Sequence, residues 1–276
     1  MTMAVPSRRS GALVSLVDEL LAGDRMLARY GLLLLGLFPV ALMLQFVDPR
    51  LLASGVDPWV KPAKFLLSLG LFALTTAWIT GFVEPGYRDT PLLRANRRTI
   101  VAAATFELAY IVFQAALGQE SHFNRGTPLH AALYALMGIG ATVLVAAMLP
   151  IAVQLVRHPV ASLSPSFRFA LVAGLVLTFL LGGGLGLYMG ARTSHAVGTE
   201  AHGLSFFGWN RTGGDLRVAH FLGIHSQQAI PLLWLSIRTL DDRNGWVLLI
   251  AGTLLYAALT LATFAQAISG LPLLGL

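Results

Sequence analysis

The chain contains no cysteine. Disulfide bonds, thiolate-held iron–sulfur clusters and cysteine-ligated metals are therefore excluded. Any metal would have to be held by histidine, carboxylate, methionine or backbone oxygen. Lysine is almost as scarce, because Lys61 and Lys64 are the only two, and the net charge of +6 is therefore carried almost wholly by arginine.

Charged residues of both signs are also few. They make up 12% of the 276 residues, whereas 56% are hydrophobic and the mean hydropathy is +0.72. A soluble domain carries about 25% charged residues, so the composition indicates a polytopic membrane protein in contact with the lipid bilayer. In so apolar a chain, the arginine excess indicates orientation and headgroup contact rather than nucleic-acid binding.

Seven apolar stretches are long enough to cross a bilayer, at about 20 residues per crossing. They lie near residues 27–47, 63–83, 99–118, 130–155, 168–190, 218–239 and 246–268. The sequence therefore predicts an all-α fold, a polytopic membrane helix bundle with a seven-helix transmembrane domain over residues 27–276. Residues 1–26 are expected to be a cytoplasmic or interfacial segment, with either an N-terminal amphipathic helix over 11–23 or an extension of the first span.

The basic residues predict an orientation. With the N-terminus inside, the inner segments hold twelve of the arginines and lysines and the outer segments hold seven. Because positive charge accumulates on the cytoplasmic side, this favours an N-inside, C-outside protein of the bacterial cytoplasmic (inner) membrane. The loop at 191–217 is the longest, and its aromatic residues indicate an ordered lid: Phe206, Phe207 and Trp209.

The histidines are distributed unevenly. Only His158 is expected on the inner side; the others share the outer side with Glu120, Glu200 and Asp215, and they are His122, His130, His195, His202, His220 and His225. Histidine is a common ligand of transition metals and haem, so the pattern indicates an outward-facing site. His220 and His225 are five positions apart, about 140° around a regular helix, and would chelate one ion poorly.

Polar residues also occur inside the predicted spans. Glu107 lies near the membrane centre on one face with Tyr110 and Gln114. It is either a protonated group bonded to a neighbouring helix, or a proton relay, counter-charge or supporting carboxylate for the outer site. Lys61 and Lys64 either extend to lipid headgroups or hold an anionic substrate, haem propionates or a nearby carboxylate.

The sixth predicted span carries a broad polar arc that cannot face lipid and is expected to line a cavity; its members are Arg217, His220, His225, Gln227 and Gln228. The fifth span carries a run of glycines over 182–190. Close helix packing and space for a flat cofactor account for this run equally well.

Four strings resemble those of a bacterial family of uncharacterised integral membrane proteins. They are Lys-Pro-Ala-Lys-Phe at 61–65, Ser-His-Phe-Asn at 121–124, Ser-His-Ala-Val-Gly at 194–198, and Gly-Asp-Leu-Arg-Val-Ala-His-Phe-Leu-Gly-Ile-His at 214–225. The resemblance extends from about residue 55 to 235. It implies one functional set, His122, His195, Arg217, His220 and His225, but no particular reaction.

Three functions are compatible with these patterns. The first is a membrane oxidoreductase or electron-transfer protein that binds haem b or a divalent transition metal (zinc, copper or iron) and acts on quinone or another small lipid-soluble substrate. The second is a zinc-dependent membrane hydrolase, and the third is a proton-coupled transporter or receptor that uses Glu107. The oligomeric state is not predicted.

The candidate residues for these functions fall into three groups. The expected metal ligands are His122, His130, His195, His220 and His225; the expected cofactor-binding residues are Arg125, Trp209 and Arg217; and the expected catalytic residues are Lys64, Glu107 and Asp215.

Overall fold

A computed structural model describes residues 12–192, 194–199, 203 and 207–274. Its helices are α1 (Ala12–Gly23), α2 (Arg25–Val47), α3 (Val60–Thr80), α4 (Pro85–Arg88), α5 (Pro91–Ala116), α6 (Pro128–Ala146), α7 (Met148–Arg157), α8 (Pro165–Leu177), the π-helix η1 (Thr178–Gly183), α9 (Gly184–Ala191), α10 (Leu216–Ile224), α11 (Ser226–Ile237) and α12 (Asp242–Ile268). Two short strands, β1 (Ala196–Val197) and β2 (Gly214–Asp215), pair antiparallel. The expected all-α class is confirmed.

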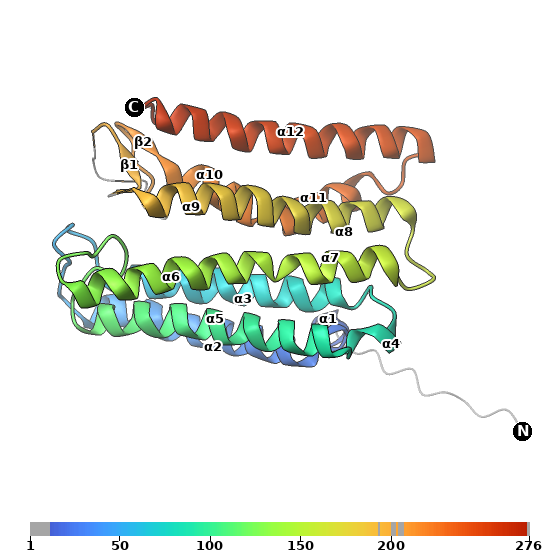
Figure 1. The fold of residues 1–276 in the computed structure, drawn as a ribbon, viewed down its shortest axis with the longest axis horizontal. Helices are drawn as coiled ribbons and strands as arrows, with labels where there is room; N and C mark the ends of the chain where they lie inside the picture. Colours follow the sequence, from blue (N-terminus) through green and yellow to red (C-terminus); the bar gives the residue numbers. More distant parts are fainter. Residues whose placement is uncertain (1–11, 193, 200–202, 204–206, 275–276) are drawn as a thin grey trace, which may run out of the picture.

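The long helices lie side by side in one bundle (Figure 1). The helices α2, α3, α5 and α6–α7 form one half of it, the segments α8–η1–α9, α10–α11 and α12 form the other, and α7 packs against α8 between the halves. One end of the bundle, here called the hairpin end, carries the loops 48–59 and 117–127 and the β1–β2 hairpin. The other, the α1 end, carries α1, α4 and the connections 158–164 and 238–241.

Three of the long helices, α5, α6 and α8, begin with the same pair of residues, a threonine or serine followed by proline. Thr90, Thr127 and Ser164 each precede a proline, and their hydroxyls accept backbone N–H bonds from the first turns of α5, α6 and α8. Such a residue satisfies an otherwise unpaired helix donor, and the proline fixes the first helical φ. These caps place the helix starts next to the polar ends of the bundle.

Six helical segments within the described residues are long and apolar enough to cross a membrane: Arg25–Val47, Val60–Thr80, Pro91–Ala116, Pro128–Arg157, Pro165–Ala191 and Asp242–Ile268. They coincide with six of the seven predicted spans. The segment predicted at 218–239 is instead divided at His225 into α10, with nine residues, and α11, with twelve. Neither piece alone reaches the length of a bilayer crossing.

The α1 helix coincides with the predicted amphipathic segment and packs on α2 and α3. Leu20 is buried, whereas Leu16 is exposed. Gly23 allows the turn into α2 to touch α3, because a Cβ there would lie 2.2 Å from the Ala77 carbonyl oxygen. The predicted interfacial position of α1 stays a prediction, and Arg8 and Arg9 lie outside the described residues.

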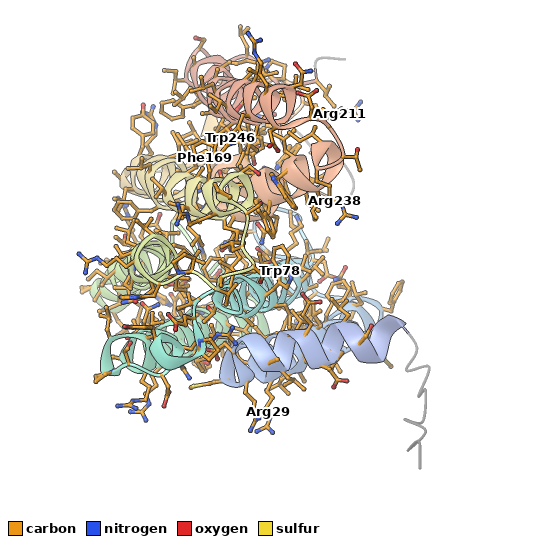
Figure 2. All side chains as sticks on the ribbon, turned by 90° about the vertical axis from the view of Figure 1, so that its right-hand side faces the viewer. Arg29, Trp78, Phe169, Arg211, Arg238 and Trp246 are labelled. Atoms are coloured by element: carbon orange, nitrogen blue, oxygen red, sulfur yellow. The ribbon has the colours of Figure 1, made fainter. Side chains whose placement is uncertain are left out.

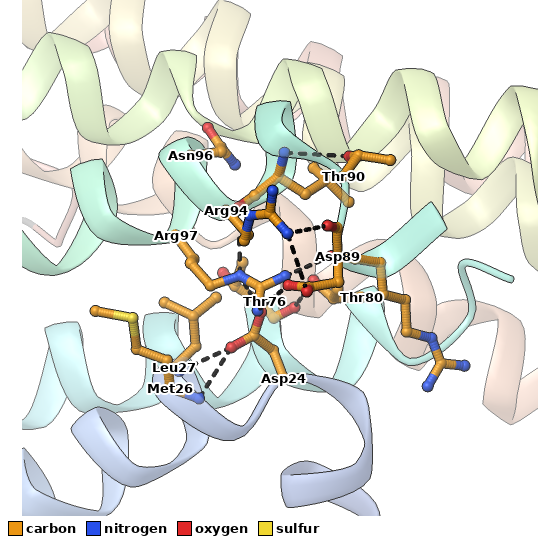
Figure 3. Close-up of polar contacts among 12 residues, drawn as sticks. Asp24, Met26, Leu27, Thr76, Thr80, Asp89, Thr90, Arg94, Asn96 and Arg97 are labelled. Carbon is orange, nitrogen blue, oxygen red and sulfur yellow. Dashed lines mark hydrogen bonds and ion pairs between the residues drawn. The ribbon is translucent and has the colours of Figure 1, made fainter. Parts of the chain in front are cut away.

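A polar cluster fixes the α1 end (Figure 3). The Asp24 carboxylate accepts from the backbone N–H groups of Met26 and Leu27 at 3.1 Å each, and it pairs with Arg97 Nε of α5 at 3.1 Å. Arg97 also lies 3.5 Å from the exposed Asp89 carboxylate. Asp24 therefore both caps α2 and joins it to α5.

Seen from the α1 end, Arg29 and Arg238 point away from the bundle (Figure 2). Phe169 and Trp246 approach each other, with ring centroids 5.7 Å apart, and thereby join α8 to α12. His158, which was predicted on the opposite side from the other histidines, stacks on Tyr87 at 3.5 Å here.

Candidate functional site

Two cations at the hairpin end hold the backbone of the long loop. Lys64 Nζ donates to the Phe207 carbonyl oxygen at 2.9 Å, and the Arg217 guanidinium donates to the carbonyl of Gly208. Gly208 has φ +70°, a conformation that side-chain-bearing residues rarely adopt. The start of α3 and the start of α10 are thus connected through this loop.

Asp215 organises the start of α10. It is 2% exposed, and its carboxylate accepts from Asn210 N at 2.8 Å and from the Arg217 backbone and side chain. Burial alone would raise the pKa of Asp215, but the hydrogen bonds and charge of Arg217 bring the pKa below its usual value. Asp215 is therefore an ionised partner for Arg217. The catalytic role expected for Asp215 stays a prediction.

His220 is held against the π-helix. Its Nδ1 lies 3.0 Å from the Gly182 carbonyl oxygen of η1. The backbone carbonyl can only accept, so this bond places the ring proton on Nδ1 and leaves Nε2 as an acceptor. A Cβ on Gly186 would lie 2.7 Å from the ring, so the glycine of α9 makes room for the imidazole.

His122 lies in the loop between α5 and α6. Its Nδ1 is 3.2 Å from Ser121 Oγ, and its ring contacts Phe65 at 5.7 Å and Tyr134 at 6.2 Å between centroids. Burial lowers the pKa of His122 well below its usual value, and the charges of Lys61 and His220 act in the same direction. Lys61 and His220 are thus the two groups whose charge acts on His122.

His195 lies in the long loop after α9. Its ring lies 6.1 Å from that of Phe123, edge to face. Burial lowers the pKa of His195 to about 4, with Arg217 and Lys61 acting in the same direction and Asp215 opposing them. The charge of Lys61 thus acts on both His122 and His195, although these histidines come from separate segments.

His225 and Trp209 belong to one aromatic cluster. Trp209 stacks on Phe207 at 4.4 Å, and Phe221 lies within 6 Å of both and 4.2 Å from His225. Because His220 contacts η1 and His225 contacts Phe221, the two histidines face different surroundings. This agrees with the expectation that they are a poor chelating pair.

Glu107 lies deeper in the bundle. It is 3% exposed, and a Cβ on Gly140 of α6 would lie 2.8 Å from its Oε1. Gln114 is 1% exposed and donates to the Tyr110 hydroxyl at 2.8 Å. Within the described part of the chain, Glu107 Oε1 and Gln114 Oε1 have no hydrogen-bond partner. The expected interior position of these residues is observed.

The division between α10 and α11 adds two more interior amides. Gln227 N donates to Thr178 Oγ1 of η1 at 3.0 Å, and Gln228 Nε2 donates to Thr75 Oγ1 of α3 at 3.2 Å. Both side chains keep carbonyl oxygens without a partner among the described residues. These two members of the predicted polar arc thus face the bundle interior, and the cavity expected beside the arc stays a prediction.

His130 and Arg125 are engaged elsewhere. His130 Nδ1 bonds Thr127 Oγ1 at 2.8 Å in the first turn of α6, and Arg125 bonds the Gly190 carbonyl oxygen at 3.0 Å above the Tyr134 ring. The first contact lies within the N-terminal cap of α6, and the second ties the loop before α6 to the backbone of α9. Three residues of the predicted site or lid lie outside the described residues: Glu200, His202 and Phe206.

Sequence reasoning missed the partners of these histidines. Thr178, Gly182 and Gly186 hold or admit the polar groups of α10 and α11. The glycine run was visible in the sequence, but its pairing with His220 was not. A close approach of η1 to α10 also appears at Gly223, where a Cβ would lie 2.6 Å from Gly182 N.

Over residues 12–192, 194–199, 203 and 207–274, no group of three or more histidine, aspartate or glutamate residues is arranged to hold a metal ion. A zinc site with three protein ligands therefore does not fit the described residues.

No family model, curated protein or solved structure matches the chain. The family resemblance of the four sequence strings thus stays a prediction.

His195 is expected to make the free energy of unfolding decrease as the pH falls. Since its pKa is lower in the folded than in the unfolded state, its contribution is complete above the unfolded pKa of about 6.5 and is lost as the pH falls toward about 4. Melting curves across this range should show a smaller acid loss for His195→Asn than for the native chain. An equal loss in both proteins would contradict the prediction.

Proposed function

We propose that the chain is a seven-pass protein of the bacterial inner membrane, with its N-terminus inside and its C-terminus outside. Counting α10–α11 as one pass, consecutive passes end alternately at the α1 end and the hairpin end, which supports seven crossings. The larger share of arginine lies toward the α1 end and supports placing that end inside.

Within this topology, the function that the geometry supports best is proton-coupled transport of a small polar molecule. The observation that carries it is the buried Glu107, whose Oε1 has no partner among the described residues. An ionisable group at membrane depth is costly to insert and typically marks a proton or substrate pathway. The unpartnered amide oxygens of Gln114, Gln227 and Gln228 extend the same polar interior.

Helix irregularity supports the same function. The π-helix η1 packs directly against α10, which ends at His225 where α11 begins. Transporters place non-helical or broken backbone at membrane depth where it lines a cavity or binding site, and π-helical turns are frequent at functional sites. In this proposal Glu107 carries the proton, while His122, His195 and His220 lie toward the outer entrance.

Replacing Glu107 with glutamine should reduce proton flux at least about tenfold in liposomes that contain a pH-sensitive dye and are subjected to a membrane potential. The amide keeps the shape of the side chain but cannot carry the proton. Glu120→Gln is the matched control, because Glu120 lies at the hairpin end and bonds Ser54. Undiminished flux in Glu107→Gln, with native stability, would refute the proton role.

The contact between His220 and the Gly182 carbonyl supports a second candidate function, that of a redox protein. The bond from His220 Nδ1 to the Gly182 carbonyl fixes the ring with Nε2 available, the arrangement commonly found for metal-bound histidine. A haem b or His-ligated metal in a redox protein that uses a quinone is the alternative. The absorbance spectrum and metal content of the purified protein separate it from the transporter, since only the redox protein requires a bound haem or metal.

A further inference from the structure

The Glu107 carboxyl group lies at the seam between α5 and α6, two candidate membrane helices that pack against each other. Its Oε1 lies 2.8 Å from the Cβ position of Gly140, so the carboxyl oxygen fills the space that a side chain on α6 would take. The backbone N–H of Ala141 interacts with the same carboxyl group. Glu107 thus reaches α6 at a point where that helix presents its backbone.

The Phe106 ring covers this seam on the outer face of the bundle. It is 37% exposed, and its Cδ1 lies 3.7 Å from the same Cβ position of Gly140. On α6, Leu136 lies one turn before Gly140 and is 48% exposed. Exposed apolar side chains of membrane-spanning helices contact lipid tails, so on the proposed topology Phe106 separates Glu107 from the bilayer.

Among the described residues, no hydrogen-bond or ion-pair partner reaches Glu107 Oε1. The charge of Lys61 acts on Glu107, but its ammonium group does not contact this oxygen. A carboxyl group held away from water stays protonated unless a close cation neutralises it. A proton and an organic cation would therefore compete for Glu107, and binding of one would expel the other.

We propose that Glu107 binds a small organic ammonium ion, which enters from the bilayer between α5 and α6. This inference rests on the proposed transport function and names its substrate class. The ammonium group pairs with the carboxylate, and the apolar part lies against Phe106, whose ring also attracts a cation. Because Oε1 fills the space beside Gly140, the seam is closed, and entry requires the Phe106 ring to turn outward. The step is an exchange, in which the ammonium ion enters and the carboxyl proton leaves to water.

Benzyltrimethylammonium is the probe, because its charge is permanent and it cannot itself carry a proton. Binding is measured by calorimetry on the full chain in nanodiscs of zwitterionic lipid near neutral pH, with benzyl alcohol as the uncharged counterpart. The cation should bind and release about one proton per chain, which makes the binding heat depend on the ionisation enthalpy of the buffer. Benzyl alcohol should release none.

Glu107→Gln should weaken benzyltrimethylammonium binding at least about tenfold and abolish the proton release, since the amide has neither a charge nor a proton to exchange. Gly140→Ala should also weaken binding at least about tenfold, because the added methyl group would take the position of Oε1. Gly138→Ala is the matched control on the same helix. A Cβ there meets nothing within 4 Å, so binding should stay native.

The proposal is overturned by absent binding of the cation, by equal binding of the cation and benzyl alcohol, or by binding without proton release. Native affinity in Glu107→Gln would also overturn it. Equal affinities in Gly140→Ala and Gly138→Ala would exclude the route between α5 and α6, and the proposal with it.

These measurements are independent of proton flux driven by a membrane potential. Cation binding and proton flux that are both lost in Glu107→Gln support the site and the function together. Absent cation binding with Glu107-dependent flux removes the site and leaves the function. Glu107-dependent cation binding in a chain without proton flux keeps the site and refutes the transport function.

Discussion

Replacing Asp24 with alanine should lower the free energy of unfolding by about 3–5 kcal/mol. Two effects combine: α2 loses its N-cap, and Arg97 loses its buried partner, since the Asp24 side chain is 3% exposed and that of Arg97 is 20% exposed. Chemical unfolding in detergent, followed by tryptophan fluorescence, measures the change.

The matched control is Asp89→Ala, which removes the other carboxylate near Arg97. The Asp89 side chain is 67% exposed, so its ion pairs with Arg94 and Arg97 are screened by water and should contribute less than about 1 kcal/mol. If Asp24→Ala and Asp89→Ala lowered the free energy of unfolding equally, the buried Asp24–Arg97 contact would contribute no more than the exposed Asp89–Arg97 contact.

Gly223→Ala should also destabilise the fold, by about 1–3 kcal/mol or more. The added methyl group would meet the backbone of Leu181 and Gly182 at 2.6–2.9 Å, and backbone cannot rotate aside. It should therefore separate α10 from η1 and weaken the bond between His220 and the Gly182 carbonyl, which a changed His220 NMR signal would report.

Gly184→Ala provides the comparison at the first residue of α9, directly after η1. A Cβ at Gly184 meets nothing within 4 Å, so alanine should be neutral or stabilise the helix by about 0.5–1 kcal/mol. If Gly223→Ala were equally tolerated, the glycine contact between η1 and α10 would not be close in the folded protein.

The sequence located the helices well for a physical reason. In lipid the backbone must satisfy its hydrogen bonds internally, so long apolar runs become helices almost regardless of tertiary contacts. Six predicted spans correspond to candidate membrane helices. The division at His225 was not predicted, because it depends on the Thr178 hydroxyl accepting from Gln227 N across 49 residues.

The candidate site was only partly predictable. The one-sided gathering of histidines followed from span positions, and the interior direction of Glu107 followed from the cost of exposing a carboxyl group to lipid. The separate engagement of His130 depends on its own helix cap, Thr127, a local signal that was overlooked. The influence of the Lys61 and His220 charges on His122 depends on loop geometry, which periodicity does not encode.

The glycine contact between η1 and α10 also bears on biogenesis. A segment carrying Arg217, two histidines and two glutamines partitions poorly into lipid by itself. During synthesis, α8 and η1 emerge first and offer α10–α11 the Gly182 carbonyl and the Thr178 hydroxyl as ready partners. On the proposed topology, the α10–α11 pass enters the bilayer against the preceding α8–η1–α9 pass, so its correct insertion depends on the close contact between Gly182 and Gly223.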